Sequence, residues 1–191
     1  MSRRFESVEG YSTWEDQGAL LQAVIPMVLR ENKHLNVVEV GTYKGRMTVM
    51  WLDEIVRHDS NFRYTCVDHF LGSSEHEQGV DYYMEFCRNT EQSRMDVECG
   101  QNAVVRVWRE RSVEAADKIE DGTMDIIYLD AAHDFDSVCA DIDAWWPKVR
   151  VGGILCGDDY IDGWQGVVKA VNLNFAPEVN VVGRQQWWIV K

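Results

Sequence analysis

Five short apolar runs alternate with segments of helical spacing, and this alternation constrains the fold more than any other feature of the chain. The runs are near-continuously apolar and cover residues 35–40, 62–67, 103–108, 124–129 and 153–157. Strands of this kind are typical of a parallel sheet that is covered by helices on both faces. Strict alternation of strand and helix therefore predicts an α/β fold with right-handed crossovers.

The segments between the runs carry apolar residues at intervals of three and four, which predicts helices. These helices are expected at residues 14–32, 46–58, from 112 onward, 135–146 and 163–175. Two last runs, 178–182 and 186–190, are close enough in sequence to pair as an antiparallel hairpin. The chain of 191 residues fits one domain. Residues 1–33 would form a helical cap at its N-terminal side.

The stretch 69–100 interrupts this rhythm because it is long and polar, with a helix expected only at 82–89. An insertion of this size beside a strand end is either a functional lid or a loosely ordered loop. Within it, His76 is expected to be exposed. Four acids in or near the helix at 135–146 are also expected on the solvated surface, namely Asp134, Asp136, Asp141 and Asp143.

Charge and composition exclude several classes of partner. The formal net charge is −13, and no basic stripe reverses it locally, so a nucleic acid is a poor candidate partner. The longest apolar stretch, 18–29, is too short to span a bilayer, and no signal peptide begins the chain. The five cysteines are scattered without a C-x-x-C pair, which favours a reducing, cytoplasmic compartment.

Carboxylates follow two of the predicted strands directly. Asp130 follows the run 124–129, and Asp158 and Asp159 follow the run 153–157. Strand ends that meet at one edge of a sheet gather such acids, and they repel one another unless a cation or shared protons relieve them. Divalent cations prefer oxygen ligands. The alternative is that Asp130 faces only a cofactor while Asp158 or Asp159 caps the next helix.

A glycine turn lies between the predicted strand 35–40 and the predicted helix 46–58. Its spacing is E-x-G-x-x-x-G, from Glu39 to Gly45. Glycine there lets the backbone approach a ligand closely. The dinucleotide fingerprint G-x-G-x-x-G and the P-loop are both missing. Asp68, at the end of the second strand, is placed to accept hydrogen bonds from ribose hydroxyls. A nucleoside-like ligand is favoured over the alternative, a plain strand–helix turn.

These motifs resemble those of the class I S-adenosylmethionine-dependent methyltransferases. The resemblance covers about residues 35–175 and is carried by Glu39-Val-Gly-Thr-Tyr-Lys-Gly45, Val67-Asp68, Leu129-Asp130-Ala-Ala-His133 and Gly152-Gly-Ile-Leu-Cys-Gly-Asp158-Asp159-Tyr160. It points in particular to the branch of macrocin-type O-methyltransferases and cephalosporin-hydroxylase-like proteins. The family implies a Rossmann-like, seven-stranded, mostly parallel sheet with a C-terminal antiparallel hairpin.

The resemblance also implies how the cofactor S-adenosylmethionine is held. Gly41, Tyr43 and Gly45 would line its methionine end, and Glu39 would anchor the turn. Asp68 would bind the ribose. Asp130 would also contact the cofactor. Ser112 would lie near the adenine, although serine is equally an ordinary N-cap for the helix that follows it.

The same resemblance implies the catalytic groups. Asp130, Asp158 and Asp159 would hold Mg²⁺, which lowers the pKa of a coordinated hydroxyl. His133 would take the acceptor's proton. Its alternative role is a helix-start residue that bonds a backbone carbonyl.

The function implied is Mg²⁺-assisted methyl transfer from S-adenosylmethionine to a hydroxyl of a small molecule. Two alternatives stay open: a metal-independent methyltransferase and a non-catalytic, S-adenosylmethionine-binding accessory protein. Assembly into a homo-oligomer is also left open.

Overall fold

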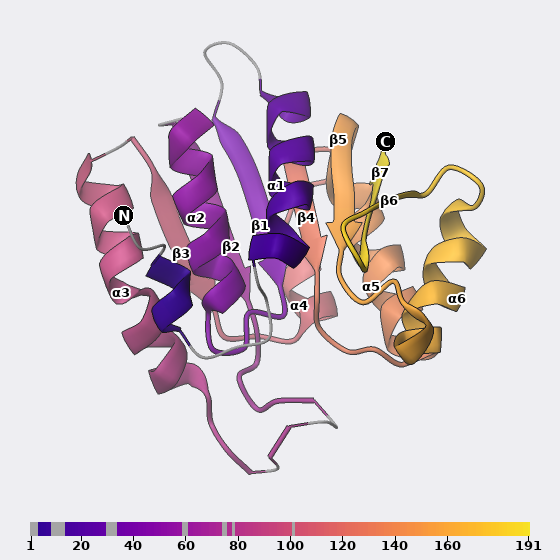
Figure 1. Cartoon of the computed structure of the whole chain (residues 1–191), viewed down its shortest axis with the longest axis horizontal. Helices are drawn as coiled ribbons and strands as arrows, with labels where there is room; N and C mark the ends of the chain where they lie inside the picture. The colour runs from indigo at the N-terminus through magenta and orange to yellow at the C-terminus, as the bar shows by residue number, and fades with distance from the viewer. Residues whose placement is uncertain are drawn as a thin grey trace.

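A computed structural model describes residues 4–8, 14–29, 34–58, 61–73, 76–77, 79–100 and 102–191. Seven strands form one sheet in the order β3-β2-β1-β4-β5-β7-β6 (Figure 1). They are β1 (Leu35–Val40), β2 (Phe62–Val67), β3 (Val104–Trp108), β4 (Met124–Leu129), β5 (Val149–Gly157), β6 (Asn180–Val182) and β7 (Gln186–Val190). Strands β1 to β5 are parallel, and β7 is antiparallel to both β5 and β6. The predicted α/β class, the mostly parallel sheet and the C-terminal hairpin are confirmed.

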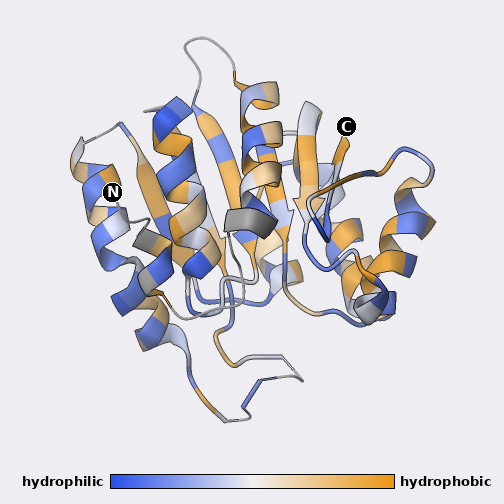
Figure 2. Cartoon of the chain, viewed as in Figure 1, coloured by the Kyte–Doolittle hydropathy of each residue, from blue (hydrophilic) through white to orange (hydrophobic). Residues whose placement is uncertain are grey.

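Helices cover both faces of the sheet. Successive strand residues point to opposite sides, so apolar strands present an apolar surface on each face that helices bury. The α-helices are α1 (Trp14–Val28), α2 (Arg46–His58), α3 (Tyr83–Gly100), α4 (Ser112–Ala116), α5 (Phe135–Trp145) and α6 (Gln165–Phe175). Val37 of β1 packs in the core under α1, α2 and α3, whereas Val38 packs in the core under α4, α5 and α6. In Figure 2 the strands are largely apolar, while the helices carry apolar and polar residues side by side. Among the described residues, no helix combines the length and apolarity that a membrane span requires.

Short 3₁₀ turns complete the architecture. They are η1 (Arg4–Ser7), η2 (Trp146–Lys148) and η3 (Asp162–Trp164). The predicted N-terminal cap is described in part, as η1 and α1, and its other residues lie outside the described range. Helix α1 contains Pro26 and contributes Leu20, Leu21, Val24 and Ile25 to the core.

The segment 69–100 differs from the sequence expectation. Helix α3 occupies Tyr83–Gly100 rather than 82–89, and it packs against α2 as the crossover between β2 and β3. Its buried stripe of Phe86, Thr90, Ser93 and Val97 follows helical spacing but includes two polar residues, which obscured the pattern. The described part of the predicted insertion that lies outside α3 is therefore limited to residues 69–73, 76–77 and 79–82. This part projects from the edge where the parallel strands end (Figure 1).

Candidate cofactor cleft and acidic centre

A cavity of about 440 Å³ lies at the carboxyl edge of the sheet. Its walls come from the turn after β1, the end of β2, the segment 69–82, the β3–α4 connection, the end of β4 and one side of α5. Five of the predicted cofactor residues line it, namely Gly41, Tyr43, Asp68, Ser112 and Asp130. Residues far apart in the sequence are thus brought to one cavity at the strand ends, as the fold rule for α/β sheets predicts.

Gly41 allows the turn after β1 to pass directly against the end of β4. Its φ is +87°, and a Cβ atom at this position would lie 2.0 Å from the carbonyl oxygen of Asp130. Gly45 also has a φ of +87°, but its missing Cβ makes room for α3, since the atom would meet Thr90 Cγ2 at 2.4 Å. Gly41 therefore borders the cavity, whereas Gly45 serves the packing of α3 against the turn.

Asp68 organises the backbone around the cavity. Its Oδ2 accepts hydrogen bonds from the amides of Thr42 (2.9 Å) and Tyr43 (2.8 Å), and its Oδ1 accepts one from the amide of Phe70 (2.6 Å). A carboxylate that accepts several backbone N–H groups holds those segments in one geometry. Asp68 thus joins the glycine turn to the start of the 69–82 segment, in addition to lining the cavity.

Glu39 lies outside the cavity lining, in the core between β1, β2 and α2. Its fully buried Oε2 accepts hydrogen bonds from the hydroxyls of Thr48 (2.6 Å) and Tyr64 (2.7 Å). Burial raises the pKa of Glu39 to about 8, although both hydrogen bonds act in the opposite direction. The side chain therefore links β1 to β2 and α2, and it is mainly uncharged at neutral pH.

Three aromatic rings meet above the glycine turn. The ring of Tyr43 lies 4.2 Å from that of His76 and 4.8 Å from that of Tyr82, measured between centroids. All three residues line the cavity. The expectation that His76 is exposed is therefore wrong, and the reason is that its neighbours in the sequence are polar while its ring partner lies 33 residues earlier.

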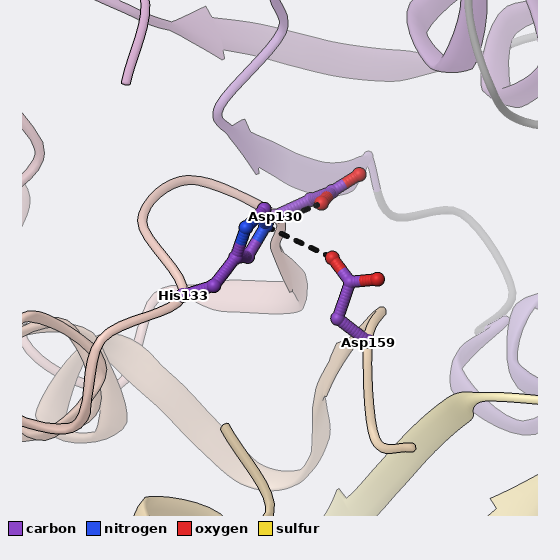
Figure 3. A group of neighbouring side chains, drawn as sticks. All are labelled: Asp130, His133 and Asp159. Atoms are coloured by element: carbon purple, nitrogen blue, oxygen red, sulfur yellow. Dashed lines mark ion pairs between the residues drawn. The ribbon is translucent and has the colours of Figure 1, made fainter. Parts of the chain in front are cut away.

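Asp130, His133 and Asp159 form a compact acidic centre beside the cavity (Figure 3). His133 Nε2 lies 2.9 Å from Asp159 Oδ2 and 3.9 Å from Asp130 Oδ1. One ligand atom from each residue lies within 4.8 Å of the other two. Asp130 also lines the large cavity, so the centre adjoins the space that would hold a cofactor.

Asp158, which the sequence analysis grouped with Asp130 and Asp159, is not among these converging ligand groups. Its buried carboxylate accepts hydrogen bonds from Gln17 Nε2 of α1 and from Gln186 Nε2 of β7, the latter at 3.0 Å. Gln17 Oε1 is in turn 3.4 Å from the Tyr128 hydroxyl, which donates to Asp130 Oδ2 at 3.3 Å. Asp158 is thus linked to Asp130 through Gln17 and Tyr128. The third group that converges with Asp130 and Asp159 is His133.

The sequence alternatives for these residues are also resolved in part. The residue before α4 is Arg111, so Ser112 is not the N-cap of that helix. Helix α6 is preceded by Trp164, so neither Asp158 nor Asp159 caps it. Asp134 does cap α5, accepting a hydrogen bond from the amide of Ser137 at 3.0 Å. Ser112, Asp158 and Asp159 are therefore available for roles other than capping.

The close approach of these groups changes their proton affinity. Burial alone lowers the pKa of His133, but hydrogen bonds and charges from Asp130 and Asp159 outweigh it and raise the pKa to about 10. Burial raises the pKa of Asp130 to about 7, with the charges of Asp158 and Asp159 adding to the effect. The imidazole Nε2 is within 3 Å of Asp159 Oδ2, and a pKa of about 10 keeps the ring mainly protonated at neutral pH.

Asp141 corrects a further expectation, since it is buried rather than solvated. Only 7% of the residue is exposed, and it lines the large cavity. The Ser112 hydroxyl donates to its Oδ1 and accepts a hydrogen bond from Trp145 Nε1 at 2.8 Å. Burial raises the pKa of Asp141 to about 6, against the effect of the Ser112 hydrogen bond.

Comparisons with known proteins agree with this geometry. Residues 38–160 match the model of a family described as a methyltransferase domain. A solved structure from Corynebacterium glutamicum is 16% identical, with a TM-score of 0.65, over 97% of this chain and 84% of that chain. CalS11, a TDP-rhamnose 3′-O-methyltransferase in calicheamicin biosynthesis, is 18% identical, with a TM-score of 0.64, over 90% of this chain and 77% of that chain. The O-methyltransferase NovP is 20% identical, with a TM-score of 0.60, over 90% of this chain and 78% of that chain.

Proposed function

We infer the function from one premise: the chain belongs to the methyltransferase domain family, in its class I, S-adenosylmethionine-dependent form. We propose that it transfers the methyl group of S-adenosylmethionine to a hydroxyl of a small molecule, with the help of a divalent cation. The observation that carries the proposal is that Asp130 belongs both to the cofactor-sized cavity and to the acid–imidazole centre beside it. The donor and a reacting hydroxyl would therefore meet at this residue.

The cavity has the polar groups that the cofactor needs, in the order of the strands. Gly41 and Tyr43 follow β1, Asp68 follows β2 and Ser112 follows β3. We assign the methionine end to the turn after β1, the ribose to Asp68 and the adenine to the region of Ser112. The rings of Tyr43, His76 and Tyr82 would cover the sulfonium side, because aromatic faces attract cations.

The donor atoms of the acidic centre fit a divalent cation. Two carboxylate oxygens, one from Asp130 and one from Asp159, converge there, and a cation between them would relieve their repulsion. Oxygen ligands suit Mg²⁺ and Mn²⁺, and with carboxylates as the ligands the imidazole stays available to accept a proton. When bound, such a cation would polarise the acceptor hydroxyl and lower its pKa. We assign Asp130 and Asp159 as the carboxylate ligands and Asp158 as their support.

His133 is the proposed proton acceptor, and its surroundings set a condition on that role. The charges of Asp130 and Asp159 hold its pKa at about 10, so the imidazole is protonated at neutral pH as long as those charges are unopposed. His133 can therefore accept a proton only once a bound cation neutralises the charges of Asp130 and Asp159. The ring of Trp164 lies 4.4 Å from that of His133, and this wall would position the acceptor next to it.

A metal-independent reaction is the second candidate, and one observation favours it. The pKa of Asp130 is raised to about 7, which suits a general base at neutral pH. In that mechanism the His133 imidazolium would stay paired with Asp159 and hold it in place. Activity that survives complete removal of divalent cations would select this mechanism over the first.

The test uses Asp159→Asn, with Asp136→Asn as the matched control because Asp136 is exposed on α5 and outside the cavity lining. Binding of Mn²⁺, Mg²⁺ and S-adenosylhomocysteine is measured by calorimetry. We expect Asp159→Asn to weaken cation binding at least about tenfold, since a paired, partly buried ligand charge is lost. Its affinity for S-adenosylhomocysteine should stay within about twofold of the wild-type value.

The outcomes separate the parts of the proposal. If Asp159→Asn binds the cation as tightly as the wild type, the cation site is wrong. If the wild type fails to bind S-adenosylhomocysteine, the methyltransferase proposal itself is wrong. If the wild type binds it but methylates none of a panel of sugars, phenols and other alcohols, the accessory-protein alternative is favoured.

A further inference from the structure

Helix α1 presents a polar side chain, Gln17, on a face that is otherwise apolar. Gln17 is 1% exposed and lies on the same buried face of the helix as Leu20 and Leu21. Burying an amide costs free energy unless its donors and its acceptor find partners. A leucine or a methionine would fill this position without that cost, so the hydrogen bonds of Gln17 explain its presence better than packing does.

Both ends of the Gln17 amide are bonded, and the bonds lead to the acidic centre. Its Nε2 donates to Asp158 Oδ2, and its Oε1 accepts from the Tyr128 hydroxyl at 3.4 Å. The reverse orientation of the amide would set its oxygen against the carboxylate, so this is the orientation in which each donor meets an acceptor. The same Tyr128 hydroxyl lies 3.3 Å from Asp130 Oδ2. Gln17 therefore connects the acid after β5 to the acid after β4.

The hydrogen-bond donors to Asp158 are uncharged amides. They are Gln17 Nε2, Gln186 Nε2 at 3.0 Å and the backbone amide of Asp159 at 2.8 Å. Among the described residues, Asp158 has no lysine or arginine partner. A basic side chain would also hold the carboxylate, but its charge would cancel that of the acid. Amide donors fix the geometry and leave the negative charge of the centre available to a cation.

Tyr128 is fixed by packing, so its hydroxyl can orient Asp130. The residue is fully buried, and its ring meets the ring of Trp51 edge-on, with 5.8 Å between the centroids. The hydroxyl is within hydrogen-bond distance of Asp130 Oδ2, whereas Asp130 Oδ1 faces the imidazole of His133 at 3.9 Å. The two oxygens of Asp130 therefore have different partners, and the Tyr128 hydroxyl sets the rotation of the carboxylate that presents Oδ1 to the centre.

We propose that Gln17 and Tyr128 are positioning residues for the cation site, with Gln17 holding Asp158 and the Tyr128 hydroxyl, and Tyr128 holding Asp130. This inference rests on the cation site of the proposed function. Hydrogen-bond partners of metal ligands commonly contribute tenfold to a hundredfold to the affinity for the metal, by about the same range in different proteins. Helix α1, which packs against β4, β5 and β7, would thus take part in the site as well as in the core.

The experiment removes each hydrogen-bonding group while keeping the volume of the side chain. Gln17→Met loses the amide, and Tyr128→Phe loses only the hydroxyl. Tyr64→Phe is the matched control, because Tyr64 is equally buried and its hydroxyl donates to Glu39 at 2.7 Å rather than to the centre. Binding of Mn²⁺ is measured by calorimetry and by electron paramagnetic resonance, binding of S-adenosylhomocysteine by calorimetry, and folding by thermal unfolding.

We expect Gln17→Met and Tyr128→Phe each to weaken Mn²⁺ binding by about tenfold to a hundredfold. Their affinity for S-adenosylhomocysteine should stay within about twofold of the wild-type value. Tyr64→Phe should unfold at a lower temperature than the wild type and still bind Mn²⁺ within about twofold of the wild-type affinity. A merely structural role would not give this split, because a loosened core would affect all three variants alike.

Two results would overturn the inference and leave the proposed function intact. One is a folded Gln17→Met or Tyr128→Phe protein that binds Mn²⁺ as tightly as the wild type. The other is a Tyr64→Phe protein that loses as much Mn²⁺ affinity as those two variants. Should Gln17→Met fail to fold, Tyr128→Phe decides. A wild type that binds no Mn²⁺ would refute the cation site of the proposed function together with this inference, so the two kinds of failure are distinguishable.

Discussion

Replacing Glu39 by glutamine should remove a large pH dependence from the stability of the protein. The Glu39 carboxyl is fully buried, and its pKa in the folded state is about 8 against 4.5 as the reference value. Because the folded-state pKa is the higher one, the stabilising contribution is fully present below pH 4.5 and is lost as the pH rises towards 8. Glutamine cannot ionise, yet its carbonyl oxygen can still accept from Thr48 and Tyr64.

The size of the effect follows from the two pKa values. Each unit of separation corresponds to about 1.4 kcal/mol, and between pH 5 and pH 9 the titration of this one group costs the wild type about 4 kcal/mol of unfolding free energy. That is a large part of the total stability of an ordinary domain. The Glu39→Gln variant should lose about 4 kcal/mol less than the wild type over the same range.

Urea unfolding at pH 5, 7 and 9, followed by tryptophan fluorescence, measures the difference. Other titrating groups are shared by both proteins and cancel in the comparison. Glu114→Gln is the matched control, because Glu114 is exposed on α4 and should follow the wild type at every pH. Parallel curves for the wild type and Glu39→Gln would refute the reasoning, since they would mean that Glu39 is ionised in the folded protein at neutral pH.

Two further predictions concern the turn after β1. Gly41→Ala should destabilise the protein by several kcal/mol in urea unfolding, because the new Cβ would lie 2.0 Å from the Asp130 carbonyl, whereas Gly122→Ala, with φ +68° and open space, should cost about 1 kcal/mol. Equal costs for both variants would contradict this. Asp68→Ala should weaken binding of S-adenosylhomocysteine at least about tenfold. The substitution removes the ribose acceptor and leaves the amides of Thr42 and Tyr43 without their hydrogen-bond partner. Calorimetry that shows unchanged affinity would exclude the ribose assignment.

The fold was predictable from the sequence because the information lies in runs that any sheet of this kind must bury. The strand ends followed from it, and Asp68 and Asp130 were correctly placed at one edge. The roles of the two acids after β5 were harder to predict, because Asp158 and Asp159 are adjacent in the sequence but contact different partners. Which of the two joins His133 depends on the docking of Gln17 and Gln186, and no local pattern encodes those contacts.

Helix-face residues were the other source of error. Asp141 shares its helix with Asp136 and Asp143, which are exposed, and its acidic character gave no sign that it is buried. It is buried where α5 packs against α4, and its partner there, Ser112, lies 29 residues away. His76 was misplaced for the same reason, since the partner that covers it, Tyr43, belongs to a different segment.

The bonding of Asp158 has a consequence for how the protein is made. One oxygen is held from α1, near the beginning of the chain, and the other from β7, near its end. Synthesis runs from α1 towards β7, so the support of the acidic centre is completed only once β7 has left the ribosome. A chain interrupted before residue 186 would therefore keep most of its apolar strands and still lack a properly held acidic centre.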